Sequence, residues 1–361
     1  MRIVYFTHSL ASCWNHGNAH FLRGVLRELV ARGHDVQAWE PEGSWSRQNL
    51  VRDAGGDEDA WRTAYPELAV HEYTASADPA ALVDGADLVL IHEWNEPALV
   101  AAIGALRRGG ARFTLLFHDT HHRAVSDPGA MRAYDLSGYD GVLAFGETLA
   151  AVYRGWGWGE RVFVWHEAAD IRLFHPPAQE TDRSGAVWIG NWGDGERTAE
   201  LESFLLQPTQ SLGLKLDIYG VRYPEPALDL LARYGAAYHG WLPNHRAPEI
   251  FARHRMTVHV PRRFYASQLP GIPTIRVFEA LACGIPLVSA PWDDREGLFT
   301  PGRDYLVARD GDEMRAQLSA LADDASLCAA LAAHGLATIR ARHTCAHRAA
   351  ELLGIIERVR P

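Results

Sequence analysis

The sequence predicts an α/β protein of two domains, each built on a parallel sheet, and three observations support this. The chain has 361 residues, which is more than one hydrophobic core usually supports. Short apolar runs alternate with stretches whose apolar residues recur at helical spacing. This alternation stops at a polar stretch, residues 178–184, and then starts again. Because strands that alternate with helices favour a parallel sheet covered on both faces, each half is expected to form one Rossmann-like domain.

The first domain is expected to span residues 1–177. Its first strand is an apolar run at residues 3–6, and a helix follows because apolar residues recur at helical spacing up to Val30. Gly33 is expected to end this helix. Further strands are expected at residues 36–39, 88–91, 113–117, 142–145 and 162–165, and a helix at residues 98–106.

The second domain is expected to span residues 178–344. Its strands are expected at residues 187–190, 216–219, 256–260 and 286–289, and its helices at residues 199–206, 227–234 and 274–283. Beyond Asp310 the chain is rich in alanine and is expected to be helical. We expect residues 345–361 to form a C-terminal helix that packs back on the first domain.

The composition is that of a globular protein, with 47% hydrophobic and 22% charged residues. No apolar run approaches the roughly 20 residues that cross a bilayer, so no transmembrane segment is expected. The apolar start of the chain is too short for the core of a signal peptide, and we expect a cytoplasmic protein. The formal charge of -10 argues against a nucleic-acid partner, because phosphate backbones are held by clustered Lys and Arg. The four cysteines lack CxxC spacing, which argues against a zinc site and a disulfide framework.

Ligands of open parallel sheets bind at the carboxyl ends of the strands, so the loops there carry the candidate residues. In the first domain, Gly17 and Asn18 lie between the first strand and the first helix. A glycine there lets backbone amides approach an anion at the start of the helix. The loop lacks the GxGxxG spacing, which disfavours a dinucleotide such as NAD.

His118 and Asp119 directly follow the strand at residues 113–117, in the stretch His-Asp-Thr-His-His. An acid/base pair, a metal site and a polar turn capped by Asp119 are each compatible with these residues. The metal site is the least favoured of the three, because no second cluster of His, Cys or Asp completes a coordination set.

In the second domain, Gly190 and Asn191 begin a glycine-rich loop, and Arg197 follows where a helix is expected. Flexible glycines followed by a cation suit a diphosphate, and the alternative is a surface turn. Gly220, after the strand at residues 216–219, is a further candidate for nucleotide binding.

The helix expected at residues 274–283 carries the other candidates. Pro273 suits the first turn of a helix and leaves the amides of Thr274 and Ile275 to face a phosphate. Glu279 lies nearly two turns inside this otherwise apolar helix, where an unpaired carboxylate is costly. Its partner is either Arg276, in which case Glu279 has a structural role, or the two vicinal hydroxyls of a ribose.

The stretch Arg276-Val-Phe-Glu279-Ala-Leu-Ala-Cys-Gly284-Ile-Pro-Leu-Val288 resembles the donor-site helix of the group-1 glycosyltransferases of B-type fold, most closely their spore-maturation (CgeB-like) branch. Residues 17–36 and 165–176 are also similar to that family. The resemblance implies the GT-B fold, in which two Rossmann-like domains face each other across a central cleft. A nucleotide-diphosphate sugar, the donor substrate, is then expected in that cleft, and no cofactor is implied.

The resemblance also implies roles for individual residues. It places Glu279 on the ribose, the amides of Thr274 and Ile275 on the distal phosphate, and Arg197 beside the diphosphate. It places His118 on the transferred sugar. The family pattern has a second glutamate where this chain has Gly271, so the resemblance does not identify the donor sugar.

The expected function is transfer of that sugar to an unidentified acceptor, which is a small molecule, a glycan or a peptide. The resemblance implies retention of the anomeric configuration. No metal ion is expected, because the helix dipole and arginines, Arg276 among them, stabilise the leaving diphosphate. Inversion with His118 or Asp119 as general base stays open. Two other functions stay open as well: a nucleotide-sugar epimerase or hydrolase, and a catalytically silent nucleotide-sugar-binding protein.

Overall fold

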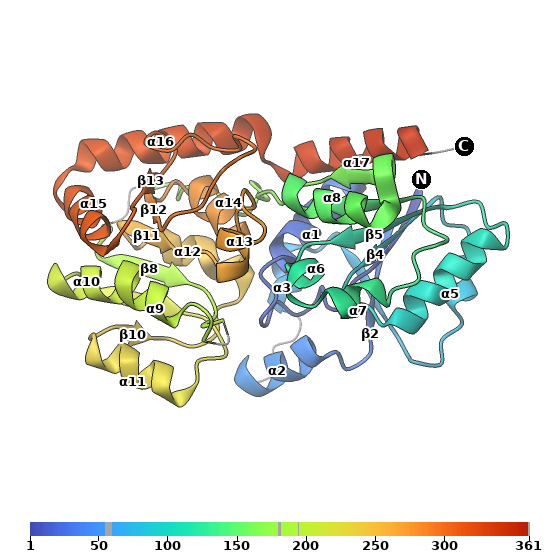
Figure 1. The fold of residues 1–361 in the computed structure, drawn as a ribbon, viewed down its shortest axis with the longest axis horizontal. Coiled ribbons are helices and arrows are strands. Elements are labelled where there is room, and N and C mark those ends of the chain that lie inside the picture. The colour runs from blue at the N-terminus through green and yellow to red at the C-terminus, as the bar shows by residue number, and fades with distance from the viewer. Residues whose placement is uncertain (55–59, 180–181, 194, 360–361) are drawn as a thin grey trace. The chain divides into compact units, whose positions relative to one another are not determined.

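The computed structural model describes residues 1–54, 60–179, 182–193 and 195–359. Part of the expected linker (180–181), one position of the glycine-rich loop (194) and the end of the expected C-terminal helix (360–361) therefore lie outside the described residues. The chain forms two compact units (Figure 1). The first unit comprises Met1–Glu167 and Cys345–Pro361, and the second comprises Ala168–Thr344.

Within the described residues, the first unit contains a seven-stranded parallel sheet in the order β3-β2-β1-β4-β5-β6-β7. The strands are β1 (Arg2–Phe6), β2 (Asp35–Pro41), β3 (Ala69–Tyr73), β4 (Leu88–His92), β5 (Thr114–Asp119), β6 (Gly141–Ala144) and β7 (Val162–Val164). The central strands β4 and β5 are buried along their whole length, which explains their continuous apolar runs. The edge strand β3 is exposed or half-buried along its whole length and has no continuous apolar run, so the apolar pattern did not predict it.

The helices of the first unit connect these strands and cover the sheet (Figure 1). They are α1 (Ala19–Ala31), α2 (Trp45–Ala54), α3 (Ala60–Ala64), α4 (Pro79–Leu82), α5 (Pro97–Arg108), α6 (Arg123–Ser126), α7 (Pro128–Arg132), α8 (Glu147–Tyr153) and α17 (Cys345–Val359). α1 ends at the left-handed Gly33 (φ 82°), as the sequence predicted. α17 packs against α1, and the indole of Trp165 donates a hydrogen bond to the Arg348 carbonyl at 2.9 Å.

The boundary between the units falls after Glu167, earlier than the expected residue 177. The next residues pack with the second unit because Ala169 forms a β-bridge with Thr344. The amide of Ala169 also donates to the carbonyl of His343 at 3.0 Å. This pairing between distant parts of the chain leaves no mark on the local apolar pattern.

Within the described residues, the second unit contains a six-stranded parallel sheet in the order β10-β9-β8-β11-β12-β13. The strands are β8 (Ala186–Ile189), β9 (Leu216–Tyr219), β10 (Ala237–Tyr238), β11 (Met256–His259), β12 (Leu287–Ser289) and β13 (Leu306–Val307). The helices are α9 (Thr198–Leu201), α10 (Gln207–Ser211), α11 (Glu225–Arg233), α12 (Ala247–Phe251), α13 (Arg263–Ser267), α14 (Ile275–Ala282), α15 (Gly311–Asp323) and α16 (Ala325–Arg342).

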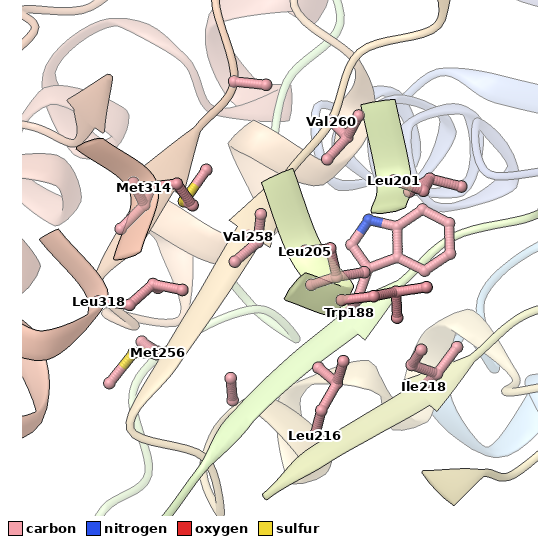
Figure 2. Packing of buried hydrophobic residues seen from close by; sticks show 14 of the residues in the cluster. Trp188, Leu201, Leu205, Leu216, Ile218, Met256, Val258, Val260, Met314 and Leu318 are labelled. Carbon is pink, nitrogen blue, oxygen red and sulfur yellow. The ribbon is translucent and has the colours of Figure 1, made fainter. Parts of the chain in front are cut away.

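The core of the second unit lies between its sheet and the helices on one face. Figure 2 shows Trp188, Ile218 and Val258 from the strands packed with Leu205 and Leu318 from helical segments. The helix expected at residues 199–206 is divided, because α9 passes through a π-helical turn at Glu202–Leu206 into α10. Pro208 lies at the start of α10, where it lacks the amide proton that a continuing α-helix needs. No helix in the described ranges has both the length and the apolar character needed to span a membrane.

Candidate functional site

Three histidines lie together at the carboxyl ends of neighbouring strands in the first unit. His8 follows β1, His92 ends β4 and His118 lies near the end of β5. The parallel register pairs His92 with His118, and their ring centroids are 5.5 Å apart. The rings of His8 and His92 stack at 5.8 Å. Because each of these strands points its carboxyl end to the same edge of the sheet, the three imidazoles form one cluster.

The predicted residue His118 is fully buried in this cluster. Its Nδ1 lies 2.9 Å from the hydroxyl of Tyr5, and its ring packs edge-on against Trp165 at 4.7 Å. Among the described residues, its Nε2 has no hydrogen-bond partner. Burial, assisted by His92, holds the pKa of His118 well below its usual value, so the ring is neutral near pH 7. A neutral imidazole with one unpaired nitrogen is able to exchange a hydrogen bond with a hydroxyl group.

Asp119, the other predicted catalytic residue, is held by hydrogen bonds from the protein. Its Oδ1 accepts from the amide of His121 at 2.9 Å, and its Oδ2 accepts from the hydroxyl of Tyr153 at 2.8 Å. Burial, followed by the nearby Glu93, raises the pKa of Asp119 to about 7. The contact with His121 is the polar turn that the sequence allowed as an alternative role for this residue.

Glu93 is a buried acid in the same cluster that the sequence pattern did not single out. Its Oε2 lies 3.0 Å from Nε2 of His92, and that nitrogen is also 2.9 Å from Oγ1 of Thr120. Burial raises the pKa of Glu93 to about 8. The available signal was its position, since His92-Glu93 ends one buried strand as His118-Asp119 ends the next.

Asn18 joins this network from the start of α1. Its side-chain amide donates to Oγ1 of Thr120 at 2.7 Å, and so it makes no cap hydrogen bond to its own helix. Gly17 precedes it, but the left-handed residue of this loop is Asn15 (φ 53°). The sequence therefore located the loop, while the structure assigns its special backbone conformation to a different residue.

Arg197 lies at the carboxyl end of the second sheet and is buried. Its guanidinium donates to the carbonyl of Val260 at 2.7 Å and to the carbonyl of Asn191 at 2.5 Å, and it lies over the ring of Trp188. Burial, with a contribution from Arg262, lowers the pKa of Arg197 to about 10, which still leaves the side chain charged near pH 7. In this structure Arg197 holds the loops after β8 and β11 together.

Gly190, Asn191 and Gly220 bring the loops after β8 and β9 into direct backbone contact. A side chain at Gly220 would place its Cβ 2.0 Å from the carbonyl oxygen of Gly190, so only glycine fits there. The side-chain oxygen of Asn191 accepts from the amide of Val221 at 3.0 Å. These three predicted residues therefore lie together and shape the same edge of the sheet as Arg197.

The start of α14 presents backbone amides at the edge of the same sheet. Thr274 is the N-cap residue, with extended backbone and no side-chain cap hydrogen bond. Among the described residues, the amides of Ile275 and Arg276 have no hydrogen-bond partner. Such amides at a helix N-terminus favour an anion.

Glu279 lies inside α14 and is fully buried. It forms an ion pair with Arg276, whose side chain is 25% exposed. The structure thus shows the pairing with Arg276 that the sequence allowed as a structural role for Glu279. Arg276 is partly exposed to solvent, whereas the carboxylate of Glu279 is fully buried.

Gly271 has left-handed backbone (φ 98°). A side chain there is strained whatever space surrounds it. Gly271 stands where the resembled family has its second glutamate, and glycine adopts this backbone conformation most easily. Within the ranges that the structure describes, no group of three or more His, Cys, Asp or Glu side chains is arranged to hold a metal ion.

Comparison with known proteins gives one partial match to a family model and one fold. Residues 197–354 match the family model described as glycosyl transferase-like, a segment that includes Arg197, α14 and Glu279. No curated protein matches the chain.

Among solved structures, HepE from Anabaena in complex with UDP and glucose is similar, with 14% sequence identity, a TM-score of 0.70 and 99% of each chain covered. An alpha-glucosyltransferase in complex with UDP and a 13-mer DNA has 11% identity and a TM-score of 0.71, again with 99% of each chain covered. A glycosyltransferase from Rickettsia africae has 11% identity and a TM-score of 0.68, with 99% of this chain and 98% of that chain covered. The predicted fold class, two Rossmann-like α/β domains of GT-B type, is confirmed. The expected cleft between the domains stays a prediction.

Proposed function

We propose that the protein is a glycosyltransferase that moves a sugar from a nucleotide-diphosphate sugar to an acceptor. The observation that carries this proposal is the glycosyl transferase-like match over residues 197–354, which coincides with the open amides of α14 and with Glu279. The similar folds crystallised with UDP support a nucleoside diphosphate as the leaving group. In the reaction, the bond from the anomeric carbon to the diphosphate breaks and a bond to the acceptor oxygen forms. The acceptor proton leaves with the nucleoside diphosphate or a nearby base.

In the second unit, α14 supplies the donor site. The amides at the start of α14, those of Thr274, Ile275 and Arg276, bind the distal phosphate. The carboxylate of Glu279 binds the ribose hydroxyls. Since Glu279 is paired with Arg276 in the structure, donor binding exchanges this partner. Arg276 then turns to the diphosphate, where its charge stabilises the leaving group. Buried Arg197 adds positive potential while it holds the loops after β8 and β11.

In the first unit, His118 contacts the transferred sugar through Nε2, which is buried and has no hydrogen-bond partner among the described residues. The resemblance to the retaining group-1 enzymes supports retention of the anomeric configuration. No metal ion is needed, because amides and arginines stabilise the diphosphate. Asp119 is the weaker candidate for a base, since both of its oxygens accept hydrogen bonds from the protein. The acceptor is a small molecule, a glycan or a peptide, and the negative formal charge of the chain disfavours the DNA with which one similar structure was crystallised. The protein acts in the cytoplasm, and the motif from Arg276 to Val288 supports the spore-maturation branch of the family.

A sugar-nucleotide sensor without catalytic activity is the second candidate. The observation that favours it is Gly271, which has left-handed backbone. In the resembled family a glutamate stands at this position and is expected to contact the donor sugar. A sensor keeps nucleotide affinity but forms no product. An epimerase or hydrolase shares the phosphate site but transfers nothing to an acceptor.

One pair of measurements separates these functions. Nucleoside diphosphates are first screened for thermal stabilisation, because a ligand that binds only the folded state raises the melting temperature. Sugar release from the matching nucleotide sugar is then followed with and without candidate acceptors. Release that depends on an acceptor supports the transferase, and release without one supports a hydrolase. Binding without release supports the sensor, and failure of every nucleoside diphosphate to stabilise the protein rejects the donor site.

A further inference from the structure

A chain of hydrogen bonds runs from β12 through β11 to the start of α14. The hydroxyl of Ser289 donates to the carbonyl of Ala290 at 2.7 Å. Nδ1 of His259 lies 2.9 Å from the Ser289 hydroxyl, and its Nε2 lies 3.2 Å from the hydroxyl of Thr274. His259 and Ser289 are register partners, and both are buried. We refer to Ser289, His259 and Thr274 as the His259 relay.

The proton positions in the His259 relay follow from its geometry. Ser289 has a single hydroxyl proton and uses it on Ala290, so its oxygen accepts from His259 and Nδ1 carries a proton. Burial, followed by the charge of Arg197, lowers the pKa of His259 to about 3, so the ring carries no second proton near pH 7. Nε2 is therefore an acceptor, and the hydroxyl of Thr274 donates to it.

The hydrogen bond from Thr274 to His259 changes how the start of α14 is capped. A threonine at the N-cap position ordinarily accepts a hydrogen bond from an amide of the first helical turn. Thr274 makes no such bond, because its side chain is turned to His259. The first-turn amide of Val277 is satisfied by the backbone carbonyl of Thr274 at 3.0 Å. Among the described residues, the amides of Ile275 and Arg276 are left without a partner.

We propose that His259 is a positioning residue that holds Thr274 away from its own helix and thereby keeps the amides at the start of α14 open to the donor diphosphate. This inference rests on the proposed donor site. His259 touches no substrate and acts through Thr274. Its role depends on an acceptor nitrogen that faces the threonine hydroxyl.

The first test measures UDP affinity by calorimetry in variants of the relay. His259→Phe keeps a planar ring but accepts no hydrogen bond, so Thr274 becomes free to cap α14 and compete with the diphosphate. We expect UDP to bind roughly tenfold more weakly, which corresponds to one hydrogen bond to a charged group. In His259→Phe/Thr274→Ala the competing hydroxyl is gone, and UDP is expected to bind more tightly than to His259→Phe. A double variant that binds as weakly as His259→Phe, or more weakly, overturns the proposal.

A conservative variant provides a control for folding. The side-chain carbonyl of His259→Gln lies near the position of Nε2 and accepts from Thr274, so this variant is expected to bind UDP more tightly than His259→Phe. Circular dichroism and thermal melts verify that each variant is folded. Equal weakening by Gln and Phe contradicts a role for the acceptor nitrogen.

The second test needs no nucleotide. ¹⁵N NMR of the histidine side chains distinguishes a protonated nitrogen from an acceptor nitrogen. His259 is assigned among the 18 histidines by the signal lost in His259→Gln. We expect a protonated Nδ1 and an unprotonated Nε2, and a proton on Nε2 overturns the relay. If the parent binds no nucleoside diphosphate, the proposed function fails, while this spectrum still decides the proton positions.

Discussion

The two units differ in how the polar groups buried near the carboxyl ends of their sheets are stabilised. In the first unit, His92, Glu93, His118 and Asp119 are buried together, and burial lowers the pKa values of the two histidines and raises those of the two carboxyls. The neutral forms are therefore favoured there. In the second unit two buried charged side chains are held by partners: carbonyls bind Arg197, and Arg276 pairs with Glu279.

This difference suits two kinds of ligand group. Neutral imidazole and carboxyl groups exchange hydrogen bonds with sugar hydroxyls, whereas fixed charges and helix amides balance a diphosphate. We therefore expect turnover to depend mainly on the first unit and nucleotide affinity mainly on the second.

Replacement of His118 tests the role of the first unit. His118→Ala should lower kcat by about 100-fold, because the sugar loses a preorganised hydrogen bond in the transition state. The dissociation constant for UDP should change by less than about threefold, since the nucleotide contacts lie in the second unit. The matched control is His334→Ala, an exposed histidine on α16. A parent-like kcat would assign His118 to a structural role.

Replacement of Glu279 tests the role of the second unit. Glu279→Ala should weaken UDP binding about tenfold, because the ribose hydroxyls lose a charged acceptor. Glu200→Ala is the matched control, since it removes a carboxylate that is paired with Arg263 on the same unit. An unchanged dissociation constant for Glu279→Ala in calorimetry removes this residue from the donor site.

The pH dependence of stability tests the neutral cluster of the first unit. The folded-state pKa values of about 8 for Glu93 and about 7 for Asp119 exceed the ordinary values of 4.5 and 3.8. The folded state therefore binds protons more tightly than the unfolded state, and this stability is full below about pH 4 and is lost as pH rises through the folded-state values. The melting temperature should fall between about pH 6 and about pH 9, and Glu93→Gln should reduce that fall by about 3 °C. A fall of the same size in Glu93→Gln would mean that Glu93 does not titrate in this range.

Two glycine substitutions compare the donor loop with an ordinary helix. Gly271→Ala should lower the free energy of unfolding by about 1–2 kcal/mol, because φ is 98° at this position. Gly354→Ala, inside α17 and with no atom within 4 Å of the added Cβ, should raise it by about 0.5–1 kcal/mol. Urea unfolding measures both values. Equal effects at the two positions would contradict the strained conformation of Gly271.

Removal of metal ions should have the smallest effect. EDTA should leave transferase activity intact, because the proposed donor site stabilises the diphosphate with amides and arginines. Activity is measured before and after chelation, with single divalent ions added back. Complete loss that one divalent ion restores would reject the metal-free scheme.

Local patterns in the sequence were sufficient for the two parallel sheets and for the loops that carry the candidates. Burial on both faces makes β4 and β5 continuously apolar, so their ends at His92 and His118 can be located from the sequence. The same reasoning located α14, since Pro273 precedes it and Glu279 interrupts its apolar face. It did not locate the edge strands β3, β10 and β13, because β3 is exposed or half-buried throughout and the other two have only two residues each.

The partners of the buried polar groups were decided only by the tertiary structure. Arg197 binds the carbonyl of Val260, and Glu93 meets His92 beside Thr120, across separations in the chain that no local pattern records. Local patterns in the sequence identified the central strands and the helices with a clear apolar face, because periodic burial selects residue types along each of these elements. The tertiary structure determined which groups are charged, neutral or open to a ligand, because burial and the neighbours brought together by folding set those states.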